Sequence, residues 1–160
     1  MDTKDIIKKI AKVHEATPDE ISAVIKNSEN DGFLFECADK VRREAYGTDV
    51  YIRGLIEFTN YCKNNCFYCG IRRDNRNIKR YRLSIDEIME CCEEGYKLGF
   101  RTFVLQGGED AGFTDDILCN MISGIKKRYS DCAVTLSMGE RTEESYKRLY
   151  DSGADRYLLR

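Results

Sequence analysis

Apolar residues recur at helical spacing near the start of the chain. Ile6, Ile7, Ile10 and Val13 share one helical face, because positions three and four apart lie above one another on a helix. This pattern predicts a first helix with one buried stripe. Further helical signals follow, and together they predict an N-terminal helical segment over residues 1–48.

Two more helices are marked by their ends. Thr17, Pro18 and Glu20 make a capping box with proline at the first helical position, which predicts a helix start there. A third helix should end at Gly47, because glycine is favoured just beyond a helix C-terminus. The expected inner face of this third helix comprises Leu34, Phe35, Ala38 and Val41.

Beyond residue 48 the pattern changes to short apolar runs that alternate with amphipathic stretches. The runs predict strands at 50–58, 102–106, 133–138 and 155–159. The first helix between these strands is capped by Ser84 and Glu87 and ends near Gly99. The second carries the apolar residues from Ile117 to Ile125, and the third runs from Thr142 to about Ser152. The expected inner faces of the first two helices are Ile85, Ile88, Met89, Cys92 and Tyr96, then Ile117, Leu118, Met121, Ile122 and Ile125.

Strict alternation of strands and helices requires parallel strands joined by right-handed crossovers. Four such βα units amount to half of an eight-fold barrel. We therefore expect an α/β fold, a partial (βα) barrel of about four parallel strands with helices over residues 49–160, preceded by the N-terminal helices. The last strand has no covering helix after it, which favours the N-terminal portion of a longer protein. An independent four-stranded α/β domain is the alternative.

Composition narrows the class of protein. The chain of 160 residues is 42% hydrophobic and 34% charged, and its net charge of -2 creates no global field that attracts nucleic acid or an anionic membrane. It shows neither a secretory signal nor an apolar run of membrane-spanning length. Eight cysteines without an export signal indicate reduced thiols, so we expect a cytoplasmic protein rather than a disulfide framework.

The cysteines fall into two groups. Three of them, Cys62, Cys66 and Cys69, are crowded into one polar stretch directly after the first predicted strand. The other five stand among apolar residues, where free cysteine behaves as a small hydrophobe, and we expect them in the core. These five are Cys37, Cys91, Cys92, Cys119 and Cys132.

The spacing Cys-x3-Cys-x2-Cys offers three thiolates. A cubane iron–sulfur cluster has four irons, so three ligands would leave one iron open to a chelating small molecule. Structural zinc needs four ligands, and His14, Cys37 or Cys132 would have to supply the fourth from a distance. The spacing of the three cysteines favours an iron–sulfur cluster, and a zinc site is the remaining alternative.

The ends of the later strands carry polar residues that suit a ligand. Residues 107–110 read Gly-Gly-Glu-Asp after the second strand, Gly139 and Glu140 follow the third, and Arg160 ends the fourth. Sites on parallel barrels gather at these carboxyl ends. Acidic groups suit an ammonium or ribose hydroxyls, and arginine suits a carboxylate. S-adenosylmethionine fits that description, although each motif alone could be a simple turn before a helix.

The cysteine motif, with Tyr68 before its last cysteine, resembles the signature of the radical S-adenosylmethionine (SAM) enzymes. The wider string GLIEFTNYCKNNCFYCGIRRDN, then TFVLQGGED, TLSMGE and GADRYLLR, resembles the biotin-synthase-like group and, within it, the HydE family of FeFe-hydrogenase maturases. The similarity runs from about residue 50 to 160. Members of the HydE family are about twice as long as this chain, so the resemblance also marks it as an N-terminal portion.

This resemblance implies a 4Fe–4S cluster on Cys62, Cys66 and Cys69, with the amine and carboxylate of SAM on the fourth iron. Reductive cleavage of the bound SAM would then give methionine and a 5′-deoxyadenosyl radical. The implied contacts to SAM are the Tyr68 backbone to adenine, Gly107, Gly108 and Glu109 to the methionine amine, Glu140 and Ser137 to ribose, and Arg160 to the methionine carboxylate.

The resemblance also implies partners. These are a small-molecule or iron-complex substrate in the assembly of the FeFe-hydrogenase active-site cluster, a reductant protein such as a ferredoxin or flavodoxin, and other hydrogenase maturases. A methylornithine synthase or a sulfur-inserting enzyme of the same group is the nearest alternative.

A zinc-binding interaction module is an alternative from a different class. Its contact face would be the basic stretch between residues 63 and 82, where only Asp74 is acidic, and such a run can track phosphates. We expect no membrane partner, and we regard nucleic-acid binding as the weaker interpretation of the basic stretch. The cations of the stretch are Lys63, Arg72, Arg73, Arg76, Lys79, Arg80 and Arg82.

Overall fold

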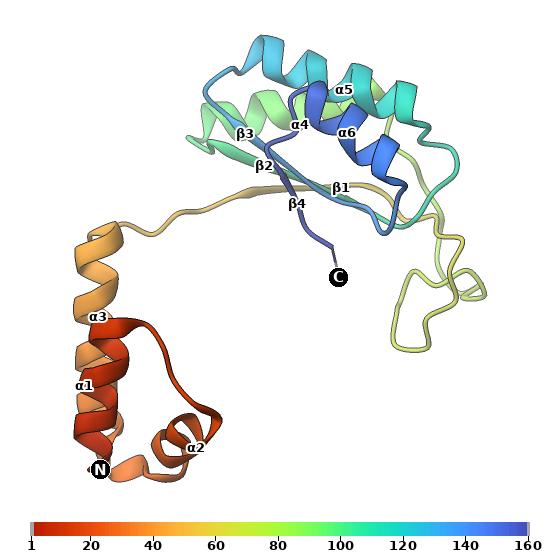
Figure 1. Cartoon of the computed structure of the whole chain (residues 1–160). Coiled ribbons are helices and arrows are strands. Elements are labelled where there is room, and N and C mark those ends of the chain that lie inside the picture. Colours follow the sequence, from red (N-terminus) through yellow and green to blue (C-terminus); the bar gives the residue numbers. More distant parts are fainter. Residues whose placement is uncertain (1, 160) are drawn as a thin grey trace. The chain divides into compact units, whose positions relative to one another are not determined.

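The computed structural model describes residues 2–159 and divides the chain into two compact units, residues 1–51 and 52–160 (Figure 1). Each unit has its own internal contacts. The predicted role of Arg160 lies outside the described residues. Among residues 2–159, no helix combines the length and the apolar character that crossing a membrane would require.

The first unit consists of helices α1 (Thr3–Val13), α2 (Pro18–Lys26) and α3 (Asp31–Tyr46), with a short 3-10 turn (Ser28–Asn30) before α3. The predicted capping box is present, since Thr17 accepts from Glu20 N–H at 3.3 Å and donates its own N–H to the Glu20 carboxylate at 2.9 Å. Gly47 ends α3 with φ of 67°, in the left-handed region.

The predicted faces of these helices are correct only in part. Ile6 and Ile7 are buried, whereas Val13 is 46% exposed. On α3, Phe35 and Ala38 are exposed, contrary to the prediction. The helical period does not tell which side of a short helix meets its neighbours, and a unit of three helices has few residues to bury.

The second unit is a four-stranded sheet with three helices. Its elements alternate as β1 (Gly54–Thr59), α4 (Ile85–Lys97), β2 (Thr102–Gly107), α5 (Asp115–Arg128), β3 (Ala133–Ser137), α6 (Glu143–Asp151) and β4 (Arg156–Tyr157). The strands are all parallel and lie in the order β1-β2-β3-β4. Figure 1 shows α4, α5 and α6 on the same face of the sheet. Sequential order with the helices on one face is the arrangement of a (βα) barrel, and it confirms the predicted α/β class.

Two strands differ from the predicted ranges by more than one residue at an end. The first strand begins at Gly54 rather than at residue 50, and the last contains only Arg156 and Tyr157. β4 has a partner on one side only, so only its β3-facing backbone groups are held by a ladder.

The core lies between the sheet and its helices. Ile56 and Phe58 on β1 alternate with Glu57, which faces the opposite side and is exposed. Ser84 and Glu87 form the predicted capping box of α4, which aims Ile88 into this core. Side chains from all three helices fill it: Ile88, Cys92, Leu118, Met121, Ile122, Ile125 and Leu149.

The five cysteines predicted for the core do not all lie there. Cys92 and Cys132 are buried, as predicted, and burial raises the pKa of Cys92 to about 12. Cys91 is exposed, because one residue along a helix turns the side chain by about 100° away from the sheet. Cys37 and Cys119 are half-buried.

Candidate functional site

The chain leaves β1 at Asn60 and returns beside it at Tyr81, which closes a long loop. Asn60 N–H donates to Tyr81 O at 3.3 Å, and its side chain accepts from Tyr81 N–H at 2.8 Å and donates to Lys79 O at 2.8 Å. Leu83 N–H donates to Phe58 O at 2.8 Å. These bonds fix the base of the loop against the carboxyl end of β1.

The three motif cysteines lie on this loop. Cys69 N–H donates to Cys66 O at 3.0 Å, which forms a tight turn, and Asn64 N–H donates to Cys62 Sγ at 3.4 Å. Cys66 is exposed, whereas Cys62 and Cys69 are half-buried, and all three are free thiols.

Two glycines at the end of β2 bring the next loop against the cysteine loop. A Cβ on Gly108 would lie 2.2 Å from Tyr61 O and 2.7 Å from Cys62 Cβ, and a Cβ on Gly107 would lie 2.7 Å from Thr59 Cγ2. No side chain fits at those distances. Glycine at these two positions is therefore required for the backbone of β2 to reach the cysteine-bearing segment.

Glu109 ties three segments together through its carboxylate. Its oxygens accept from Lys63 Nζ at 2.9 Å, Asn64 Nδ2 at 2.8 Å and Glu140 N–H at 3.3 Å. Partial burial raises the pKa of Glu109, but the hydrogen bonds from Lys63 and Glu140 outweigh it and lower the pKa overall. A Cβ on Gly139 would lie 2.0 Å from Glu109 Cγ, so this glycine leaves room for the carboxylate.

Asp110, the next residue, is a buried structural anion. It accepts from Thr59 Oγ1 at 2.7 Å, from Arg82 Nε at 2.6 Å and Nη2 at 2.8 Å, and from Gly112 N–H at 2.8 Å. The Arg82 guanidinium also stacks on the Tyr61 ring, 3.9 Å from its centroid. This network joins the returning end of the cysteine loop to the end of β2.

The predicted site residues that the structure describes all line one cavity of about 860 Å³ at the carboxyl ends of β1, β2 and β3. The cavity thus unites the cysteine loop with the glycine-rich and acidic strand ends that the sequence singled out. The Tyr68 side chain is 93% exposed at its rim. The predicted residues on the wall are Cys62, Cys66, Tyr68, Cys69, Gly107, Gly108, Glu109, Ser137 and Glu140.

Sequence reasoning missed Glu57 and Gln106 on the floor of this cavity and found only Ser137. Glu57, Gln106 and Ser137 are register neighbours on β1, β2 and β3, and Gln106 Nε2 donates to Glu57 Oε1 at 3.3 Å. They lie on the sheet face opposite the helices. Strict alternation within the strands could have identified Glu57 and Gln106, because their apolar neighbours face the core.

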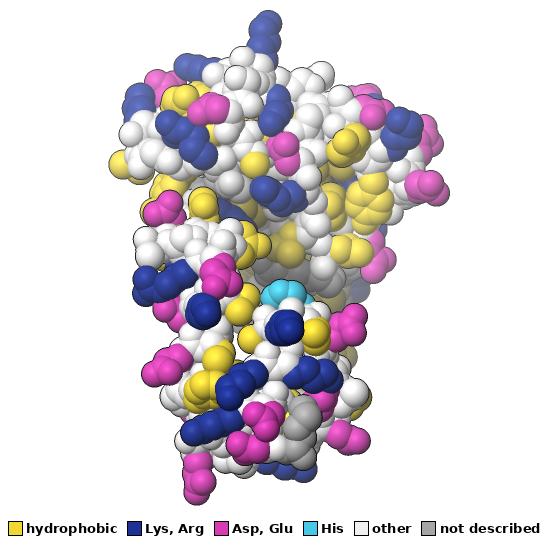
Figure 2. Space-filling model, turned by 60° about the vertical axis from the view of Figure 1, so that its left-hand side comes forward, with side chains coloured by type: hydrophobic (Ala, Val, Ile, Leu, Met, Phe, Trp, Pro, Cys, Tyr) yellow, Lys and Arg dark blue, Asp and Glu magenta, His cyan; other side chains and the backbone are white. Residues whose placement is uncertain are grey.

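The basic stretch is used inside the molecule more than the sequence suggested. Lys63 pairs with Glu109, Arg82 with Asp110, and Arg80 donates to backbone carbonyls of its own loop. These internal contacts do not favour a surface on which the whole stretch tracks phosphates. Figure 2 shows another property of the surface: on the face in view, cationic and acidic side chains are interspersed.

The donor set of the cavity fits a cluster better than a single metal ion. Among residues 2–159, no three cysteine, histidine or carboxylate side chains converge on one ion position. A cubane cluster does not require such convergence, because each thiolate binds a different iron. Cys132 cannot complete a zinc site there: it precedes β3, at the opposite end of the sheet, and its Sγ contacts Phe100 O at 3.8 Å.

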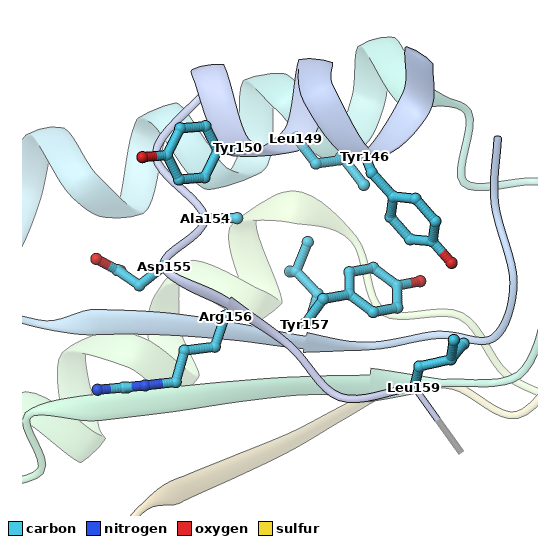
Figure 3. Close-up of a pocket in the computed structure, with 9 residues that line it drawn as sticks. Tyr146, Leu149, Tyr150, Ala154, Asp155, Arg156, Tyr157 and Leu159 are labelled. Carbon is cyan, nitrogen blue, oxygen red and sulfur yellow. The ribbon is translucent and has the colours of Figure 1, made fainter. Parts of the chain in front are cut away.

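A second hollow lies at the open edge of the sheet, beside β4 and α6. Figure 3 shows the rings of Tyr146 and Tyr157 meeting there, with centroids 4.8 Å apart and an interplanar angle of 81°. Leu149 and Leu159 extend the apolar lining of this groove, whose volume is about 330 Å³. Its described lining includes Asp155 and Arg156 but none of the motif cysteines.

Comparison with known proteins places the site in a family. The sequence model of the Radical SAM superfamily matches residues 56–159. Over 127 residues the chain is 48% identical to the [FeFe] hydrogenase maturase subunit HydE of Thermotoga maritima, covering 79% of this chain and 36% of that protein. It is 32% identical over 110 residues to 3-methylornithine synthase of Methanosarcina barkeri, covering 68% of this chain and 31% of that protein.

Comparison of the fold with solved structures supports the same family. The crystal structure of methylornithine synthase (PylB) matches with a TM-score of 0.85 at 25% identity, covering 96% of this chain and 46% of that one. The chain thus spans about a third to a half of the length of these relatives. Superfamily members such as HydE and biotin synthase use a 4Fe–4S cluster and SAM. With the family match extending over residues 56–159, which include the cysteine loop, most of β1 and the other three strands, this chain belongs to the radical SAM superfamily.

Proposed function

We propose that this chain is the cluster- and SAM-binding part of a radical SAM enzyme of the HydE type, which acts in assembly of the FeFe-hydrogenase active-site cluster. The observation that carries the proposal is the single cavity that joins the three cysteines to the ends of β2 and β3. The 48% identity to a HydE supports the narrower assignment.

In this proposal the thiolates of Cys62, Cys66 and Cys69 hold the 4Fe–4S cluster. When bound, the cluster and SAM supply reductive cleavage of the sulfonium and a 5′-deoxyadenosyl radical. The protein contributes placement: the cysteine loop is fixed at its base to β1, and its thiolates face the cavity that the strand ends complete.

The strand ends would bind the remainder of SAM. Gly107 and Gly108 line the cavity beside the cysteine loop, and the Glu109 carboxylate, whose pKa is lowered, offers an anion to the methionine ammonium. Glu140 and Ser137 line the same wall and would bind the ribose. Tyr68, at the rim, would contact the adenine through its backbone, and Arg160 would bind the methionine carboxylate.

Radical SAM enzymes act on small-molecule substrates and take electrons from a reductant. For this chain we propose a small-molecule or iron-complex substrate, a ferredoxin or flavodoxin as electron donor, and other hydrogenase maturases as partners. Its cysteine content supports a cytoplasmic location.

The test is anaerobic reconstitution of the chain with iron and sulfide. We expect a brown protein with about four irons and four sulfides per chain. SAM should perturb the electron paramagnetic resonance spectrum of the reduced cluster. A colourless protein with one tightly bound zinc would contradict the proposal and support the zinc module instead.

Two matched variants locate the ligands. Cys66→Ala should lose the cluster, whereas Cys91→Ala, at an exposed cysteine of α4 away from the cavity, should retain it. Loss of the cluster from Cys91→Ala would contradict the ligand assignment.

A methylornithine synthase activity is the second candidate, because that enzyme is similar in both sequence and fold. A complete protein carrying this segment would separate the two. Hydrogenase activation in a maturation assay supports the HydE type, and formation of methylornithine supports the alternative.

A further inference from the structure

Arg80, on the cysteine loop, has backbone carbonyls rather than acids as its partners, and it reaches more of them than Arg72, which donates to Cys69 O at 3.5 Å. The Arg80 guanidinium donates through Nη1 to Asn60 O and to Ile71 O, the latter at 2.8 Å. Nη2 donates to Arg72 O at 2.6 Å, to Asn75 O at 3.3 Å and to Arg73 O at 3.4 Å. A single side chain thus satisfies five carbonyls of one loop.

The positions of two of these carbonyls along the chain show which parts of the loop Arg80 holds together. Asn60 lies two residues before Cys62, and Ile71 lies two residues after Cys69. Both carbonyls meet the same nitrogen of Arg80, so the two ends of the cysteine-bearing segment are held together at one point.

Closing a segment in this way restricts the conformations open to its three thiols. An unconstrained loop of this length must lose that freedom when it binds a ligand through three side chains. The cysteine loop has little regular structure of its own to prevent such freedom, since residues 60–80 contain only turns and bends. The contacts of Arg80 supply the restraint instead.

We propose that Arg80 is a positioning residue for the iron–sulfur cluster: its guanidinium clamps residues 60 and 71 together and so presets the spacing of Cys62, Cys66 and Cys69 before the cluster binds. This inference rests on the proposed cluster. It assigns Arg80 a role inside the loop, in place of the surface role that its basic neighbourhood suggested.

The chemistry of the clamp requires arginine. Guanidinium is planar and presents five N–H donors in a fixed fork, whereas the lysine ammonium is a compact point charge with three donors. Lysine at position 80 keeps the charge but cannot span both groups of carbonyls. Arg80→Lys should therefore release iron at the wild-type rate if only the charge matters, and faster than the wild type if the clamp matters.

The experiment compares iron release from the reconstituted 160-residue chain and its variants under a ferrous chelator. We expect Arg80→Lys and Arg80→Gln each to release iron at least fivefold faster than the wild type. Arg76→Lys is the matched control, since Arg76 is exposed on the same loop and the structure shows no side-chain hydrogen bond or ion pair for it among the described residues. It should release iron at the wild-type rate.

Each outcome decides one proposal. Wild-type iron release by Arg80→Lys would overturn the clamp, because charge alone would then suffice. Faster release together with loss of near-ultraviolet circular dichroism would overturn it as well, because the effect would be global unfolding. A wild-type chain that binds no cluster would instead overturn the proposed function.

A second measurement needs no variant. In the cluster-free wild-type chain, the Arg73 amide donates to Asn64 O at 2.8 Å across the clamped loop. We expect hydrogen exchange of peptides covering residues 60–75 to be at least tenfold slower than that of residues 49–53, which form no regular structure. Equal exchange rates in the two segments would overturn a loop that is preset before the cluster arrives.

Discussion

Replacing Asp110 by asparagine should destabilise the barrel unit. The Asp110 side chain is 3% exposed and accepts four hydrogen bonds, one from Thr59, two from Arg82 and one from Gly112. Asparagine has one oxygen in place of two and carries no charge. The change therefore leaves the Arg82 guanidinium without its counter-ion and gives some of the four donors no acceptor.

The size of the effect follows from the pKa of Asp110. Burial raises this pKa, but the hydrogen bonds from Arg82, Gly112 and Thr59 outweigh it and lower the pKa from 3.8 to about 2. A pKa lowered by roughly 2 corresponds to roughly 2–3 kcal/mol of stabilisation of the native state by the ionised carboxylate. We expect Asp110→Asn to lower the free energy of unfolding by about 2–3 kcal/mol at pH 7.

Urea unfolding of the cluster-free chain, followed by far-ultraviolet circular dichroism, measures this loss. Asp151→Asn is the control, because Asp151 forms an exposed pair with Lys147 four residues earlier on α6. That pair should contribute no more than about 0.5 kcal/mol. A loss below about 1 kcal/mol in Asp110→Asn would refute the reasoning from the network.

The pH dependence tests the same carboxylate. Because the folded-state pKa of Asp110 lies below its usual value, its contribution is fully present above about pH 4 and is lost as the pH falls toward 2. The wild type and Asp110→Asn should therefore converge in stability over this window. A gap that stays constant down to pH 2 would show that packing, not charge, causes the difference.

Three further outcomes can be checked. Gly108→Ala should lose cluster-bound iron because its Cβ has no room, and a Gly108→Ala protein that keeps its full iron content would contradict the close approach. Gly124→Ala, in open space on α5, is the control and should stabilise the chain by about 0.5–1 kcal/mol in urea unfolding. Iodoacetamide at pH 8 should label Cys91 and spare Cys92, whose pKa burial raises to about 12, and peptide mass spectrometry would detect the reverse. Glu109→Gln should weaken SAM binding to the reconstituted chain at least tenfold by calorimetry, and unchanged affinity would remove Glu109 from the ligand site.

Much of the fold is legible in the sequence because its signals are local. The capping boxes at Thr17 and Ser84 predict helix starts that the structure contains. The alternation of strands and helices predicts the parallel sheet for the same reason, since each unit carries its own period. The length of β4 was not predictable in this way: a strand continues only while a neighbour supplies a ladder, and neighbours are not a local property.

The site shows the same division. The crowding of three cysteines predicts a metal centre, and the placement of motifs at strand ends predicts that they share one cavity. Assigning all five remaining cysteines to the core missed the exposure of Cys91, although the helical period had placed Cys92, and not Cys91, on the expected inner face of this helix.

Charge counting failed on the cysteine loop for a physical reason. A run of cations opposite one nearby acid looks unpaired when only sequence neighbours are counted. Arg82 has its acid on a different strand end, at Asp110, and within residues 2–159 the partners of Arg80 are five carbonyl dipoles rather than an acid. Carbonyls carry no formal charge, so no count of net charge can detect them. A cationic loop beside a metal motif should therefore be examined for internal carbonyl partners before it is assigned to an external anion.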